Sequence, residues 1–157
     1  PGLDVLDPIL KEQFLRNYQR TQSRLNSVYK KLFADDRAME MAFVRAGGLL
    51  IAGPAPTDGG GVVPGYADQR QVELRVGSGF TPLEAIRICT LNGATYLGRA
   101  DRVGSIAVGK QADLVVIDGN PAVNIDDIAK VELVFRQGVG YDPAKFIASV
   151  KGRVGLY

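Results

Sequence analysis

Apolar side chains recur at helical spacing through the first part of the chain, between residues 4 and 33. They follow one another at intervals of three, four and seven positions among Lys, Arg and Gln: Leu10, Phe14, Tyr18, Leu25, Tyr29 and Leu32. This pattern predicts an amphipathic helix. Its expected start is Asp7 and Pro8, because Asp caps helices and Pro suits the first helical position.

A second helix, a buried strand and a long loop are expected next. Asp35 is predicted to cap the helix, with Met39 and Phe43 facing inward, and residues 46–48 end it with two glycines. Residues 49–52 are wholly apolar, and such a run directly after a helix predicts a buried parallel strand. Residues 53–66 hold three prolines and five glycines among fourteen residues. They are therefore predicted to form a loop of the kind that often carries function.

Shorter elements are predicted for the rest of the chain. A helix is expected over residues 68–77, and another from the capping sequence Thr-Pro-Leu-Glu at Thr81 to about Asn92. The other expected elements are a helix at 94–97, a strand–turn–strand at 104–110, a strand with a buried centre at 112–117, a strand at 131–136 and a helix at 143–150. The change from helices to strands predicts an internal boundary, with residues 1–98 before it and residues 99–157 after it.

Composition narrows the class of protein. Of the 157 residues, 46% are hydrophobic and 23% are charged, which is the balance of a soluble globular protein and excludes a mainly disordered chain. No apolar run approaches the roughly 20 residues of a membrane-spanning helix, so no membrane partner is expected. The net charge of +2 is too small to indicate a nucleic-acid partner. A single cysteine, Cys89, excludes an internal disulfide framework.

Histidine is absent from the chain. Mechanisms that need histidine within it are therefore excluded: the Ser-His-Asp triad, Cys–His pairs and His-ligated zinc. The chain begins at Pro1 without a methionine or a charged-then-apolar leader. This start favours a processed chain or a piece of a longer one and leaves the compartment open.

Several spaced motifs carry a resemblance to a known family. Residues 102–121 resemble a C-terminal signature of the amidohydrolase superfamily. From residue 104 on they read Gly-Ser-Ile-Ala-Val-Gly-Lys-Gln-Ala-Asp-Leu-Val-Val-Ile-Asp-Gly-Asn-Pro. The branch is the one that includes imidazolonepropionase-like and Xaa-Pro dipeptidase-like enzymes. Residues 79–86 and 90–94 look like the last barrel helices of that family. The resemblance is continuous from about residue 37 to the C-terminus.

The resemblance implies an α/β fold built around a (β/α)8 TIM barrel with its active site at the C-terminal ends of the strands. A small composite β-sandwich would stand beside the barrel. Residues 1–98 would form the C-terminal part of the barrel, and residues 99–157 would supply strands and a terminal helix to the sandwich. The implied partners are the N-terminal part of the barrel and, by analogy, further copies of the same protein in a homo-oligomer.

The resemblance also implies the chemistry. Family members are metal-dependent hydrolases, usually with zinc, and act on amide or related bonds. Their ligands are a His-X-His pair on the first strand, a carboxylated lysine or an acid in mid-barrel, two further histidines and an aspartate after the last strand. Since this chain has no histidine, a divalent metal, zinc by expectation, would be bound mainly by residues outside it. No metal ligand is assigned within the chain.

The family aspartate has no obvious counterpart here. In relatives the last strand ends in Gly-Thr-Asp, and an ungapped comparison places Gly53, Pro54 and Ala55 on those three positions. Pro56 continues the match, which favours Ala55 as the catalytic position. Asp58 takes that position only if the loop carries a three-residue insertion, and it otherwise reads as a turn residue. With Ala55 there, the protein is expected to be inactive, because a methyl group neither binds a metal nor transfers a proton.

Three further residues follow the loop and are candidates for substrate binding: Tyr66, Asp68 and Arg70. A helix-start role is an equally good interpretation of Asp68. The preferred function is the C-terminal part of a metal-dependent amidohydrolase that cleaves an N-acyl amino acid or a dipeptide. The alternative is a non-catalytic interaction or scaffold subunit, or a pseudoenzyme fragment.

Overall fold

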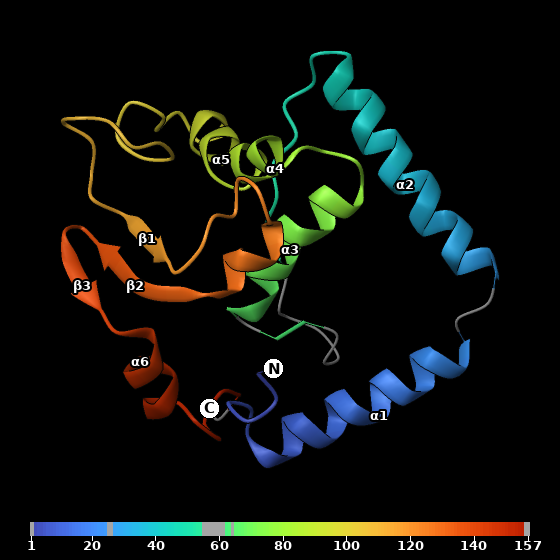
Figure 1. The fold of residues 1–157 in the computed structure, drawn as a ribbon. Coiled ribbons are helices and arrows are strands. Elements are labelled where there is room, and N and C mark those ends of the chain that lie inside the picture. Colours follow the sequence, from blue (N-terminus) through green and yellow to red (C-terminus); the bar gives the residue numbers. More distant parts are fainter. Residues whose placement is uncertain (1, 25–26, 55–61, 64, 156–157) are drawn as a thin grey trace.

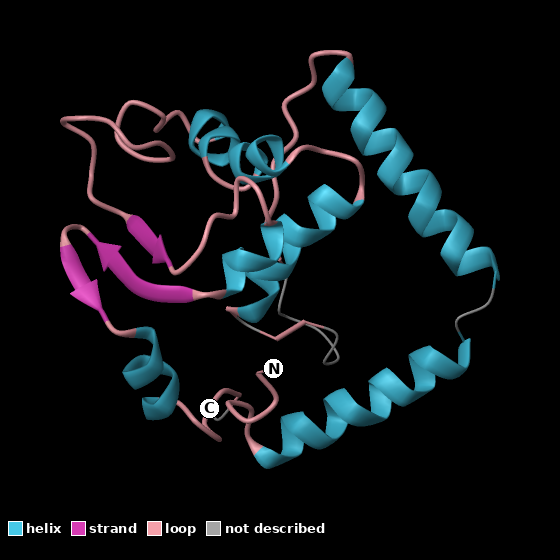
Figure 2. Cartoon of the chain, in the orientation of Figure 1, coloured by secondary structure: helices cyan, strands magenta, loops and turns pink. Residues whose placement is uncertain are grey.

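The computed structural model describes residues 2–24, 27–54, 62–63 and 65–155. Helices α1 and α2 form an arm around a central group of helices, and the strands lie on the opposite side of that group (Figure 1). Figure 2 shows the same division by element type, with one group of strands among helices. The elements are α1 (Pro8–Arg24), α2 (Ser27–Arg45), α3 (Tyr66–Gly77), α4 (Pro82–Ile88), α5 (Leu91–Tyr96), β1 (Leu114–Ile117), the 3-10 helix η1 (Ile125–Ala129), β2 (Val131–Arg136), β3 (Val139–Tyr141) and α6 (Pro143–Ser149).

The arm differs in three ways from the helices that the sequence predicts. The first helix was expected to run to residue 33, but α1 ends at Arg24 and α2 begins at Ser27. Asp35 is not an N-cap: it lies inside α2, where its carboxylate accepts a hydrogen bond from Nζ of Lys31 at 2.8 Å. The inward orientation of Met39 and Phe43 is also wrong, because both are exposed. The described residues place no layer over this face of α2.

A buried core lies among α3, α4 and α5 and includes Val72, Phe80, Ala85, Ile88 and Ala94. A capping box starts α4, as predicted. Oγ1 of Thr81 accepts a hydrogen bond from the backbone N–H of Glu84 at 3.3 Å, and the Glu84 carboxylate accepts one from the Thr81 N–H at 2.8 Å. The pair satisfies two N–H groups that the helix would leave without partners.

The helix from Thr81 is shorter than predicted. It was expected to reach about Asn92, but α4 ends at Ile88 and α5 begins at Leu91. The interruption lies at Thr90, whose φ of −132° and ψ of −84° are not helical. Its hydroxyl donates to the Ile86 carbonyl at 2.6 Å, a local side-chain bond that competes with helix continuation.

The strands form one antiparallel sheet in the order β1-β2-β3. The limits of β2 are those predicted, and β1 lies within the predicted 112–117. The expected buried centre of β1 is wrong: Val115 is 56% exposed. Only one sheet layer is present in the described part of the chain, so these side chains have no second layer to contact. The composite sandwich and the boundary between residues 98 and 99 stay predictions.

The segment at 104–110 contains turns and no strand, contrary to the expected strand–turn–strand. The ammonium group of Lys110 closes this segment. It donates to the carbonyl of Ala100 and, at 2.6 Å, to the hydroxyl of Ser105. Because these bonds hold the segment in a compact loop, it is not extended enough to pair as strands.

The predicted buried strand at 49–52 is also absent, and Leu49 and Ile51 are exposed. A parallel strand needs a neighbouring strand on at least one side, and the described residues place none beside this run. Its carbonyl at Leu50 accepts instead from the side-chain amide of Asn92 at 2.8 Å. The run is therefore linked to α5 by this bond, while Leu49 and Ile51 stay exposed and Leu50 and Ala52 are half-buried.

The two ends of the chain lie side by side (Figure 1). Leu6 and Val154 form a parallel β-bridge, and a second buried cluster of Val5, Leu6 and Val63 lies at this point. Among the described residues, no helix is long and apolar enough to cross a membrane.

Candidate functional site

The predicted catalytic position, Ala55, and its alternative, Asp58, lie outside the described residues. The structure places the backbone on both sides of them. On the N-terminal side, Leu50 is hydrogen-bonded to Asn92 of α5. On the C-terminal side, Val63 is buried and Tyr66 begins α3. The assignment of the catalytic position to Ala55 stays a prediction.

The three candidates for substrate binding lie on the first turns of α3 but do not converge. The Tyr66 ring packs into the cluster of Val5, Leu6 and Val63. Asp68 is exposed and lies in the first helical turn, where a negative charge is favourable, although no side chain caps this helix. Arg70 forms an ion pair with Glu73 of the same helix at 2.6 Å.

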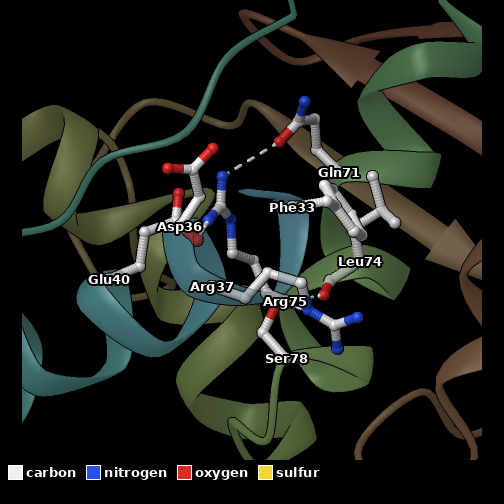
Figure 3. Close-up of a pocket in the computed structure, with 8 residues that line it drawn as sticks. All are labelled: Phe33, Asp36, Arg37, Glu40, Gln71, Leu74, Arg75 and Ser78. Carbon is white, nitrogen blue, oxygen red and sulfur yellow. Dashed lines mark hydrogen bonds and ion pairs between the residues drawn. The ribbon is translucent and has the colours of Figure 1, made fainter. Parts of the chain in front are cut away.

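A groove of about 200 Å³ lies between α2 and α3 (Figure 3). It is lined mainly by charged and polar side chains: Phe33, Asp36, Arg37, Glu40, Gln71, Leu74, Arg75 and Ser78. Sequence reasoning missed this arrangement, because its members lie about 40 positions apart on two helices and no local pattern connects them.

Arg75 is the centre of the groove. Its guanidinium forms an ion pair with the Glu40 carboxylate and donates to the side-chain carbonyl of Gln71 at 3.3 Å. The Arg75 side chain is 14% exposed, and its Nε is buried without a hydrogen-bond partner among the described residues. A buried guanidinium is costly unless it is paired. The Glu40 carboxylate is therefore the main group that compensates the Arg75 charge in the groove.

A second link between α2 and α3 lies beside the first. Nε of Arg37 donates to the Ser78 hydroxyl at 2.9 Å, and that hydroxyl donates to the Leu74 carbonyl at 2.8 Å. The Arg37 guanidinium also lies 5.4 Å from the centre of the Phe33 ring, within the range of a cation–π contact. The charges of the groove are thus used largely to hold the two helices together.

We expect Glu40→Ala to lower the free energy of unfolding by about 1–3 kcal/mol. The change removes the ion pair of the Arg75 guanidinium and leaves only its hydrogen bond to Gln71. Chemical denaturation of the full-length protein measures the effect. Glu12→Ala is the matched control, since it removes the exposed ion pair with Arg16 and should cost about 0.5 kcal/mol or less. If both variants lose the same free energy of unfolding, the Arg75–Glu40 pair stabilises the protein no more than an exposed ion pair does.

The end of α2 is joined to the start of α4 by Arg45 and Glu84, whose charged groups lie 2.5 Å apart. The pKa of Glu84 is lowered from 4.5 to about 2. The largest cause is the hydrogen bond from Arg45, and the hydrogen bonds from Thr81 add to it. Arg45 also lies 6.0 Å from the centre of the buried Phe80 ring. The carboxylate thus serves as both a helix cap and an inter-helix ion pair.

We expect the Arg45–Glu84 pair to make the free energy of unfolding fall at acidic pH. The pKa of Glu84 is lower in the folded state, so its contribution is complete above about pH 4.5 and is lost as the pH falls toward about 2. In Glu84→Gln that part of the pH dependence is absent. The check is the denaturation midpoint between about pH 6 and about pH 2. Glu132→Gln changes an exposed residue of β2 and serves as the matched control. A Glu84→Gln curve with the same pH dependence as this control contradicts the expectation.

Asp127 organises the loop that leads into β2. Its carboxylate accepts from the backbone N–H of Asn120 at 2.9 Å, from the side-chain amide of Asn124 at 3.2 Å, and pairs with Lys130 at 2.9 Å. The hydrogen bond from Lys130 is the largest cause that lowers the pKa of Asp127. This carboxylate is used for structure and is fully engaged by its neighbours.

Cys89 is a free thiol and is half-buried. Burial raises the pKa of the Cys89 thiol, an effect that the charge of Arg75 partly opposes. A thiol with a raised pKa is protonated at neutral pH and is a poor nucleophile. Nothing here favours covalent catalysis by this residue.

The donor set for a metal is incomplete in the described part of the chain. No group of three or more His, Cys, Asp or Glu side chains lies there in a position to hold a metal ion. The residues that are present therefore do not fit a complete metal site by themselves.

Comparison with known protein families gives a match to the amidohydrolase family over residues 58–141. Among curated proteins, the imidazolonepropionase of Micrococcus luteus is 38% identical over 82 residues, which cover 49% of this chain and 20% of that protein. Adenine deaminase 2 of a Jannaschia species is 36% identical over 78 residues, which cover 49% of this chain and 12% of that protein. The chain spans a fifth or less of the length of these relatives.

Solved structures of related proteins share the fold of this chain. A putative prolidase from Bifidobacterium longum matches with a TM-score of 0.56 and 32% identity, over 68% of this chain and 27% of that one. A prolidase complexed with N-methylphosphonate-L-proline matches with a TM-score of 0.54 and 30% identity, over 68% of this chain and 26% of that one.

Proposed function

Since this chain belongs to the amidohydrolase family, we propose that it forms the C-terminal part of a metal-dependent hydrolase that cleaves an amide or peptide-like C–N bond. The proposed substrates are N-acyl amino acids or dipeptides. The likeness to a putative prolidase and to a prolidase complexed with N-methylphosphonate-L-proline, each over 68% of the chain, supports this class.

One observation carries the proposal. The family match begins within the segment after the apolar run at 49–52 and continues through α3, α4, α5 and the sheet. In a TIM-barrel hydrolase, the loop after a strand is where catalytic residues stand. The match therefore supports the interpretation of residues 58–66 as part of a loop at the active-site end of the barrel. Ala55 lies before the matched residues, and its assignment as the catalytic position rests on the ungapped comparison with the family motif.

The role of the family aspartate is proton transfer to the leaving amine during cleavage. A carboxylate can accept and release a proton near neutral pH when its surroundings tune its pKa. The methyl group of Ala55 has neither capacity. We therefore propose that the protein binds substrates of this class but hydrolyses them very slowly as it stands.

The divalent metal of the proposal, zinc by expectation, would be held mainly by residues outside this chain. The described residues do not supply its donor set, so no step of the reaction is assigned to a metal here. What the chain contributes is the loop, the position of Ala55 and the helices that hold both ends of that loop.

The proposed partners are the N-terminal part of the barrel and further copies of the same protein. Exposed apolar side chains support the first of these. Leu49 and Ile51 are uncovered in a run that was expected to be a buried strand, and a neighbouring barrel strand would cover them. The exposed Val115 of β1 would be covered by a second sheet layer in the same way.

The hydrolysis assay that tests the proposal uses the full-length protein carrying Ala55→Asp, with zinc supplied. N-acyl amino acids and dipeptides ending in proline are the test substrates, and a carboxylic ester serves as the comparison outside the class. Turnover of the amides supports the proposal. Absence of turnover for all of the amides contradicts it.

A second candidate is a non-catalytic scaffold subunit or a pseudoenzyme fragment. The observations that favour it are the absence of histidine from all 157 residues and the alanine at position 55. The natural gene discriminates between the two candidates. A His-X-His segment encoded upstream of Pro1 favours the hydrolase, and its absence favours the scaffold.

A further inference from the structure

The two ends of the described chain pair with each other through backbone hydrogen bonds. The Val154 N–H donates to the Val5 carbonyl at 2.9 Å, and the Asp7 N–H donates to the Val154 carbonyl at 3.0 Å. A third bond lies next to these two, in which the Gly152 N–H donates to the Asp4 carbonyl at 3.0 Å. These bonds create the parallel bridge between Leu6 and Val154.

The paired ends bury apolar side chains against the start of α3. Leu6 is 3% exposed and lies in one cluster with Val5 and Val63. Tyr66 and Val154 are partly buried against the same cluster. Val63 and Tyr66 are the last part of the 53–66 segment, so the chain ends contact that segment where it enters the helix.

Two close approaches show how tightly this contact is built. A Cβ added at Gly2 would lie 2.5 Å from Cδ2 of the Tyr66 ring, and the Gly2 φ is +88°. A Cβ added at Gly155 would lie 2.5 Å from Oδ2 of Asp7, and the Gly155 φ is +103°. Only glycine adopts such a φ at little cost and also leaves room for the neighbouring atoms.

We propose that residues 2–7 and 152–155 form a clasp that positions Val63 and Tyr66 and thereby fixes where the 53–66 segment enters α3. The catalytic meaning of this position rests on the proposed function, because that function places Ala55 on the same segment. The residues of the clasp are positioning residues. They contact the segment that leads to the candidate site and do not contact the reacting atoms themselves.

The hydrogen bonds of the helix start connect the clasp to α3. The Ala67 N–H donates to the Val63 carbonyl at 3.0 Å, and the Asp68 N–H donates to the Gly65 carbonyl at 3.2 Å. Both bonds depend on Val63 and Gly65 staying beside the helix. Loosening the clasp should therefore expose these two amides to solvent before it affects the remote sheet.

The test is amide hydrogen exchange of the full-length protein with Gly2→Ala. We expect exchange at Ala67 and Asp68 to become about tenfold faster, because the added methyl group displaces the Tyr66 ring and strains the left-handed backbone. Gly109→Ala is the matched control: Gly109 has the same φ of +88° but nothing within 4 Å of its added Cβ. Equal exchange at these two amides in both variants overturns the proposal.

A second pair of variants separates a local effect from general destabilisation. Val154→Asp should accelerate exchange at Ala67 and Asp68, and Val154→Ile should restore slow exchange because it keeps the apolar contact. The amides of Val134 and Phe135 in β2 report on the remote sheet. If these sheet amides accelerate as much as the helix-start amides, the clasp does not act on the 53–66 segment and the proposal fails. Because exchange needs no activity, this outcome is distinct from a failure of the proposed hydrolase function.

Discussion

The full-length protein is expected to hydrolyse amide substrates about 10²–10⁴-fold faster when Ala55 is replaced by Asp, because a positioned acid–base group contributes a factor of this size. The change gives the proposed site a carboxylate that can transfer a proton to the leaving amine. The rate constant kcat, measured with saturating dipeptide or N-acyl amino acid, shows the effect. A rate equal to that of the unchanged protein contradicts the placement of the catalytic position at Ala55.

Asp58→Ala is the control that separates the two registers of the loop. In a protein that also carries Ala55→Asp, removal of the Asp58 carboxylate should leave kcat nearly unchanged if Ala55 is the catalytic position. If the loop has a three-residue insertion instead, Asp58→Ala removes the acid–base group and the rate falls by a similar factor of about 10²–10⁴. The pair of variants therefore identifies which position is catalytic.

Phe80→Ala is expected to cause the largest loss of stability among the described residues that we consider, about 3–5 kcal/mol. The Phe80 side chain is 2% exposed and lies at the end of the turn between α3 and α4. Its removal leaves a cavity in the buried core of the α3–α5 region, and a cavity of this kind adds to the lost burial energy. Denaturant unfolding of the full-length protein measures the loss.

Phe146→Ala provides the comparison for this prediction, because it removes the same side chain from α6, where Phe146 is 62% exposed. A surface truncation of this kind should change the free energy of unfolding by about 0.5 kcal/mol or less. If Phe146→Ala costs as much as Phe80→Ala, then α6 is covered in the full-length protein by a part outside this chain. A loss below about 1 kcal/mol for Phe80→Ala itself contradicts its place in the core.

Elements that depend on neighbouring residues could be predicted from the sequence. The capping box at Thr81 and Glu84 started α4 where expected, and Asp142 capped α6 ahead of Pro143. The limits of β2 matched because a two-residue turn at Gln137 and Gly138 ends it. The resemblance to the amidohydrolase superfamily was confirmed by the family match. In each case the determining residues lie within a few positions of one another.

Features that depend on distant residues could not be predicted. The Arg75–Glu40 pair joins residues 35 positions apart, and no local pattern signals it. Residues 49–52 are apolar enough for a buried strand, but a parallel strand forms only beside other strands. The pairing of Leu6 with Val154 joins the two ends of the sequence, so no sequence window contains both residues. Tertiary contact, which local patterns do not encode, decides all three.

The three-stranded sheet has a practical consequence for anyone who produces this chain alone. Among the residues that the structure describes, its outer strands, β1 and β3, each have one side without a hydrogen-bonded neighbour, and Val115 and Val139 are exposed on them. Open strand edges with apolar side chains recruit strands from other molecules and promote aggregation. If the proposed N-terminal part of the barrel covers these edges, co-expression with it is expected to give more soluble material than expression of this chain alone.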